Sequence, residues 1–159
     1  MSDAPAPVSF TIPGHLQPEV KRQVRVGTWT RRIDKPEAQN WKQKAAVFAA
    51  QAMQGHALFD EPLRLTVRWY RLKPSGYNRA ENWPWKRPDL ANLLKILEDA
   101  LTGIVWRDDS LICKEELSKR FGDSERVEVT VEVLEAQWPY RKPPKVREAA
   151  ERAERRAGR

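Results

Sequence analysis

Cysteine and long apolar runs are both scarce in this chain of 159 residues, and each scarcity excludes a class of protein. A single cysteine, Cys113, excludes an internal disulfide and a zinc site built from cysteines. No apolar run approaches the ~20 residues that a membrane-spanning helix needs. The N-terminal segment MSDAPAPVSF lacks the basic and apolar regions of a secretory signal. We therefore expect a soluble protein of the reducing cytoplasm.

Basic charge is what the chain has in excess. The formal net charge is +7 and the pI is near 9.8, which indicates a polyanionic partner, with nucleic acid ahead of an acidic membrane surface. Eight Lys and Arg against three Glu give residues 139–159 a net charge of +5, leaving +2 for the rest. Much of the basicity therefore lies on a tail.

The hydrophobic pattern predicts one α+β domain at residues 1–138, followed by a basic C-terminal tail at 139–159. A helix from Pro36 to Met53 and another from about Asp89 to Thr102 would pack on a mostly antiparallel sheet. The expected strands cover 8–12, 63–70, 104–106, a segment starting at 111, and 127–133. Residues 21–32 form either a hairpin or an extended loop, and 73–87 form a long loop.

The segment from Arg87 to Ser110 carries the chemistry. On a helical wheel its apolar residues fall in one arc of about 120°, which is a core stripe. These residues are Leu90, Leu93, Leu94, Leu97, Ala100 and Leu101. Asn92, Lys95, Glu98 and Asp99 lie on the opposite side, beside Asp89 at the expected N-cap. Each polar residue also has an ordinary explanation: a cap, an i,i+4 ion pair between Lys95 and Asp99, or an acidic turn at 108–110.

The order Pro-Asp-Leu-x-Asn-Leu-Leu-Lys, then Asp-Ala-Leu-x-Gly, then Trp-x-Asp-Asp-Ser closely resembles the central signature of the RusA family of Holliday junction resolvases. The resemblance implies a RusA-like homodimer, in a bacterial or phage-infected cell, that cuts four-way or branched DNA by paired symmetric nicks in recombination and repair. It implies Asp89, Lys95 and Asp109 as catalytic residues, with Asp99 and Asp108 at further acidic positions. It also implies carboxylates that bind Mg²⁺, for which Mn²⁺ is a possible substitute; magnesium prefers such hard oxygen ligands.

One expected ligand is missing from the motif. The family pattern usually reads Asp-x-Asp-Asn, whereas this chain has Ala91 at the second acidic position. Glu98 lies seven residues later, within about 20° on the wheel and ~10.5 Å along the helix. We therefore predict that Asp89, Glu98 and Asp109 are the metal ligands. The alternative is that Glu98 pairs with Thr102 or solvent and the site is impaired.

Basic side chains with aromatic neighbours predict a DNA-binding surface. The predicted DNA-binding residues are Lys21, Arg22, Arg25, Arg31, Arg32, Lys86 and Arg87. Trp29, Trp83 and Trp85 lie among such charges, whereas Trp41 and Trp69 are expected in the core, as is Trp106.

Three functions remain open from the sequence. The first is an active magnesium-dependent junction endonuclease. The second is a catalytically impaired junction- or DNA-binding protein that keeps the fold without the ligand lost at Ala91. The third is a basic α+β module for RNA or a protein partner. We expect no membrane partner for any of the three.

Overall fold

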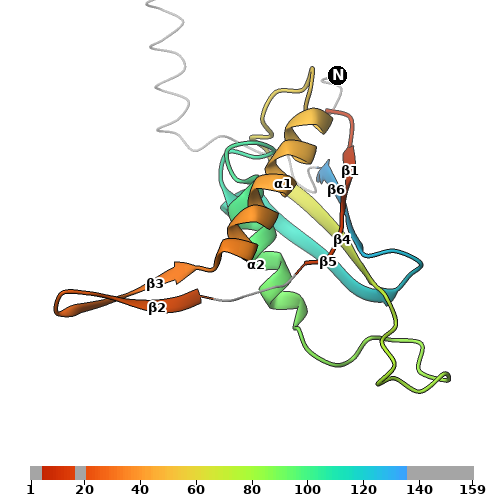
Figure 1. Cartoon of the computed structure of the whole chain (residues 1–159). Helices are drawn as coiled ribbons and strands as arrows, with labels where there is room; N and C mark the ends of the chain where they lie inside the picture. The colour runs from red at the N-terminus through yellow and green to blue at the C-terminus, as the bar shows by residue number, and fades with distance from the viewer. Residues whose placement is uncertain (1–4, 17–20, 136–159) are drawn as a thin grey trace, which may run out of the picture.

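The computed structural model describes residues 5–16 and 21–135. Figure 1 shows a sheet with two helices against it and a separate hairpin. The strands are β1 (Val8–Pro13), β2 (Lys21–Val26), β3 (Trp29–Asp34), β4 (Leu63–Arg71), β5 (Ile112–Phe121) and β6 (Arg126–Val133). The helices are α1 (Pro36–Ala52), α2 (Leu90–Leu101) and a 3₁₀ turn, η1 (Asp109–Leu111). The predicted α+β class with two main helices is confirmed, while the tail at 139–159 lies outside the described residues.

Alternation along the central strands produces one buried face of the sheet. On β4 the buried residues are Leu63, Leu65, Val67 and Trp69. On β6 they are Val127, Val129 and Val131, aligned with β4 in antiparallel register. Because successive side chains of a strand point to opposite faces, the residues between them form a polar outer face.

The two helices cover this buried face. The core contacts of α1 come from Ala38, Trp41, Ala45 and Ala49. Those of α2 come from Leu93, Ile96, Leu97, Ala100 and Leu101, with Leu90 and Leu94 partly buried against the same core. The predicted core positions of Trp41, Trp69 and Trp106 are confirmed, with 4%, 2% and 0% of their surface exposed.

The sheet is mixed, in the order β1-β6-β4-β5. Two of its pairings are antiparallel, as expected, but β5 lies parallel to β4. The segment between β4 and β5 contains α2, and a parallel pair needs such a crossover connection. The strand expected at 104–106 is reduced to isolated bridges at Trp106, with Phe59 and Thr102.

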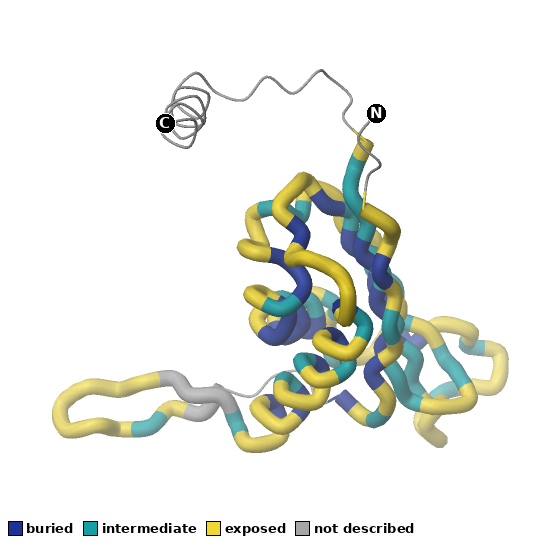
Figure 2. Tube along the Cα trace, turned by 90° about the horizontal axis from the view of Figure 1, so that it is seen from above, coloured by how far each residue is buried: buried dark blue, intermediate teal, exposed yellow. Residues whose placement is uncertain are grey.

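The strands β2 and β3 form a two-stranded sheet of their own. This hairpin leaves the body beside the start of α1 and extends away from it (Figures 1 and 2). Its described side chains are mostly exposed, Val24 excepted. Among the described residues, no helix is long and apolar enough to cross a membrane.

Candidate functional site

Asp89 lies at the N-cap of α2, but its side chain makes no capping hydrogen bond within this fully described helix. The Asp89 side chain is exposed. The capping explanation for this residue therefore fails, and the carboxylate is available for another task.

Lys119 of β5 holds the backbone that leads into Asp89. Its Nζ donates to the carbonyl oxygens of Lys86 (2.8 Å) and Pro88 (2.9 Å). Arg71 adds a longer hydrogen bond to the carbonyl of Arg87 at 3.3 Å. Burial and the nearby Arg71 charge lower the pKa of Lys119, and attraction to Asp89 opposes that shift. The edge of the sheet thus positions the N-terminus of α2.

Glu98 lies about two and a half turns further along the helix and pairs with Glu115 of β5. Burial is the largest cause that raises the pKa of Glu98 from an ordinary 4.5 to about 7. The charges of Glu115 and Asp109, a hydrogen bond with Glu115 and the charge of Asp99 raise it further. Like charges placed close together favour the protonated form of one of the acids. The predicted pairing with Thr102 involves the Glu98 backbone carbonyl, which accepts from the threonine hydroxyl at 2.8 Å.

Asp99 forms an ion pair with α1. The Nζ of Lys42, a residue of α1, lies 3.1 Å from Oδ2 of Asp99. The i,i+4 spacing suggests Lys95 as the partner of Asp99, but no ion pair of Lys95 occurs among the described residues, and Lys95 is exposed. Lys42 thus places a positive charge beside the carboxylates, while Lys95 keeps its ammonium toward solvent.

The turn before β5 separates the roles of two adjacent aspartates. Asp108 accepts the backbone N–H of Ser110 at 2.9 Å and caps η1, and hydrogen bonds from Ser110 lower its pKa. The acidic-turn explanation thus holds for Asp108. Asp109 is exposed and close enough to raise the pKa of Glu98 electrostatically.

The loop from 73 to 88 is ordered by its own side chains. Glu81 accepts from the indole of Trp85 (2.9 Å) and from the backbone N–H of Asn78 (2.7 Å), and these contacts lower its pKa. Lys86 donates its Nζ to Gly76 O at 2.7 Å and lies over the Tyr77 ring. The ammonium of Lys86, predicted to bind DNA, is therefore engaged within the loop. Trp83 and Trp85 stay 59% and 66% exposed.

These contacts define the α2–β5 edge, with β5 running opposite to α2. Lys119 meets the start of the helix near Asp89, and Glu115 meets Glu98. Nine residues of helix between Asp89 and Glu98 correspond to a rise of about 13.5 Å. Of the predicted magnesium ligands, Asp109 is close enough to Glu98 for its charge to raise the pKa of Glu98. Asp89 lies at the opposite end of α2, at its N-cap. Within the described residues, no three His, Cys, Asp or Glu side chains form a preformed metal site.

Lys42, Glu115 and Lys119 were not found by sequence reasoning. A signal existed for the last two, because Glu115 and Lys119 are in register with the inward-facing Leu65 and Trp69 of β4. Polar residues on the helix-covered face of an edge strand are candidates for a site. That alignment requires knowing that β5 pairs with β4 in parallel.

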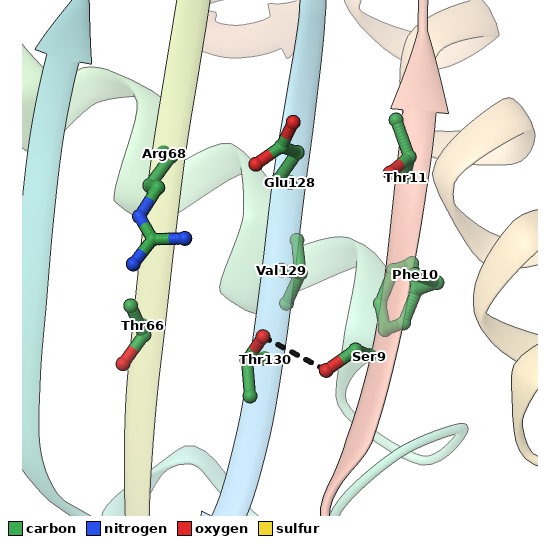
Figure 3. Close-up of a pocket in the computed structure, with 8 residues that line it drawn as sticks. All are labelled: Ser9, Phe10, Thr11, Thr66, Arg68, Glu128, Val129 and Thr130. Atoms are coloured by element: carbon green, nitrogen blue, oxygen red, sulfur yellow. Dashed lines mark hydrogen bonds between the residues drawn. The ribbon is translucent and has the colours of Figure 1, made fainter.

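A separate hollow of about 210 Å³ lies on the polar outer face of the sheet. Figure 3 shows the helices behind these strands, with the Ser9 and Thr130 hydroxyls joined by a 2.9 Å hydrogen bond. Its lining residues come from β1, β4 and β6. It is therefore distinct from the α2–β5 edge.

A fold of this kind, with acidic and basic residues gathered along one helix and an edge strand, is consistent with the resemblance in the motif. The family profile "Endodeoxyribonuclease RusA" matches residues 13–132, and the chain belongs to this family. The chain is also similar to the "Uncharacterized protein YqaN" of Bacillus subtilis (strain 168). The two are 26% identical over 141 residues, which cover 81% of this chain and 98% of that protein.

Proposed function

We propose that this protein is a magnesium-dependent endodeoxyribonuclease that resolves Holliday junctions and related branched DNA by paired symmetric nicks, in DNA recombination and repair. The observation that carries the proposal is the RusA family match over residues 13–132. Beside the family motif, the charges of Glu115 and Asp109 help to raise the pKa of Glu98. A divalent cation offsets the repulsion between neighbouring carboxylates. Magnesium fits this task because it prefers hard oxygen ligands. Mn²⁺ is a possible substitute.

Glu98, Asp109 and Asp89 are the proposed metal ligands, and Glu115 joins them in this proposal. Glu98 and Asp109 are supported by the charge of Asp109, which raises the pKa of Glu98, and Glu115 is supported by its hydrogen bond to Glu98. Asp89 is supported by its position in the family motif and by its uncapped, exposed carboxylate. Bound magnesium would offset negative charge at the scissile phosphodiester and make a bound water more acidic.

The remaining residues of the edge bind and orient DNA in this proposal. Lys95 stands one turn before Glu98 on α2, with its ammonium free to bind a phosphate oxygen and stabilise developing charge. Asp89 and Asp109 would act on the attacking water and the phosphate through the metal that they hold. Lys21, Arg22, Arg25, Arg31, Arg32, Lys86 and Arg87 are the proposed phosphate-binding residues. A C2 homodimer would place identical sites against the two strands of a junction.

The test is cleavage of a synthetic four-way junction, with and without magnesium, by the wild type and by Glu98→Gln and Asp109→Asn. We expect nicking that requires magnesium, and a loss of at least about a hundredfold in each variant because a ligand is removed. Glu116→Gln is the matched control: it neutralises the neighbouring glutamate, which is in register with the outward-facing Thr66. Wild-type rates in Glu98→Gln would rule out its ligand role.

The missing aspartate at Ala91 favours one alternative, a junction-binding protein that has lost catalysis. Tight binding to the junction without nicking, in either magnesium or manganese, would establish it. Equal binding to branched and linear DNA would instead indicate the basic module for another partner.

A further inference from the structure

The described side chains of the β2–β3 hairpin are mostly exposed. It pairs with no strand of the main sheet, and an isolated two-stranded hairpin is marginally stable in water. At its tip Val26 pairs across the strands with Trp29, and these side chains are 61% and 80% exposed. Gly27 makes the tight turn with φ of 61°, and Arg25 Nε donates to its carbonyl at 3.3 Å. An exposed apolar tip of this kind calls for a partner.

The charge of the hairpin favours a polyanion as that partner. Its sequence from Lys21 to Asp34 contains five Lys and Arg and one Asp, a net charge of +4. A second copy of the chain would bring the same positive hairpin on a protein of net charge +7, so its long-range field is repulsive. A two-stranded ribbon also has the width that a DNA groove admits.

The position of the hairpin connects it to the α2–β5 edge. It leads directly into α1 at Pro36, six residues before Lys42, which is about 9 Å along the helix. Lys42 in turn contacts Asp99 beside Glu98. The two strands of the hairpin are six residues long, so they extend roughly 20 Å beyond the start of α1. DNA held at the carboxylates would therefore lie within reach of the tip.

We infer that the β2–β3 hairpin is a DNA-binding arm whose strands contact phosphates and whose Trp29 stacks on the face of a base exposed at a branch point. Phosphate contacts give affinity without regard to DNA structure, whereas stacking on a base requires one that is exposed. Trp29 would accordingly determine the preference for branched over linear DNA. This inference rests on the proposed function for its substrate.

The test measures binding of the full chain in EDTA, so that no cleavage occurs, to a four-way junction and to a linear duplex of the same arm sequence. Trp29→Ala should weaken junction binding at least about fivefold and leave duplex binding within about twofold, because a duplex offers no exposed base. Trp29→Phe should restore most of the junction affinity. A 2-aminopurine placed at the branch should be quenched by the wild type and not by Trp29→Ala.

The arginines of the arm give a contrasting result. Arg25→Gln with Arg31→Gln should weaken binding to both DNAs and reduce the slope of log K against log salt by about 1.8. Arg68→Gln, which removes a charge on the outer face of the sheet (Figure 3), is the control and should change neither.

Three outcomes are distinguishable. Equal junction preference in Trp29→Ala and wild type overturns the arm inference and leaves the proposed function standing. A change of subunit number in Trp29→Ala, measured by mass photometry, also overturns it and assigns the tip to a second copy of the chain. A wild type without any preference for the junction overturns the proposed function itself.

Discussion

Glu98 and Glu115 are carboxylates from different elements that share a hydrogen bond, and the pKa of Glu98 is raised. Ionising both acids at neutral pH is energetically unfavourable because their negative charges repel each other. In the proposed function, a divalent cation bound near the two carboxylates would offset this repulsion.

The first prediction concerns stability against pH. The folded-state pKa of Glu98, about 7, lies above its ordinary value of 4.5, so the folded protein binds the proton more tightly than the unfolded chain. Its contribution to stability is therefore complete below pH 4.5 and lost as pH rises through 7. In EDTA, Glu98→Gln should flatten the fall of Tm between about pH 5 and 8.

Glu116→Gln serves as the control and should retain the wild-type pH dependence. Added magnesium should raise the Tm of the wild type more at about pH 8 than at about pH 6, because protonation of Glu98 competes with the metal. An identical pH profile for Glu98→Gln and wild type would contradict this explanation.

At the scale of elements, β5 connects the two ends of the α2–β5 edge. Glu115 meets the acidic end of the helix, and Lys119 holds the loop that ends at Asp89. The loop itself is braced by Glu81 and Lys86. The edge strand β5 thus contacts both Glu98 and the backbone that leads into Asp89.

A second prediction follows for Lys119→Met. Loss of its two hydrogen bonds to loop carbonyls should lower the unfolding free energy by about 1–2 kcal/mol and release the start of α2. Amide exchange at residues 86–92 should accelerate, and junction cleavage should fall at least about tenfold. Lys114→Met, an exposed lysine of the same strand, should change neither. Unaltered exchange in Lys119→Met would show that the lysine does not position Asp89.

At the scale of the whole molecule, the proposed function requires two sites on one junction. A C2 dimer would supply them because the junction has approximate two-fold symmetry. The hairpin is a largely exposed part of the subunit (Figure 2).

A third prediction tests this requirement with a supercoiled plasmid that extrudes a cruciform. Wild-type dimers should linearise it by paired nicks. Mixing wild type with Asp109→Asn in equal amounts should instead produce mostly nicked circles, since half of randomly formed dimers carry one active site. A protein that sediments as a monomer with DNA, yet still linearises the plasmid, would exclude the dimer.

The local elements were readable from the sequence because each depends on neighbours in the chain. The Pro36 helix start, the alternation on β4 and β6 and the leucine stripe of α2 are all local patterns, and the structure confirms them. The motif is equally local, and it pointed to the family that the profile match shows. Within the described residues, the departures from the expected sheet are the parallel β4–β5 pairing and the reduction of 104–106 to isolated bridges.

The sequence by itself determined most of the elements, the family and the positions of Asp89, Lys95 and Asp109 along the chain. Only the tertiary structure decided which charges meet: Glu98 with Glu115, Asp99 with Lys42, and Lys119 with the backbone before Asp89. The reason is physical. These contacts join elements distant in sequence, and their partners depend on strand order and register, which local spacing does not encode.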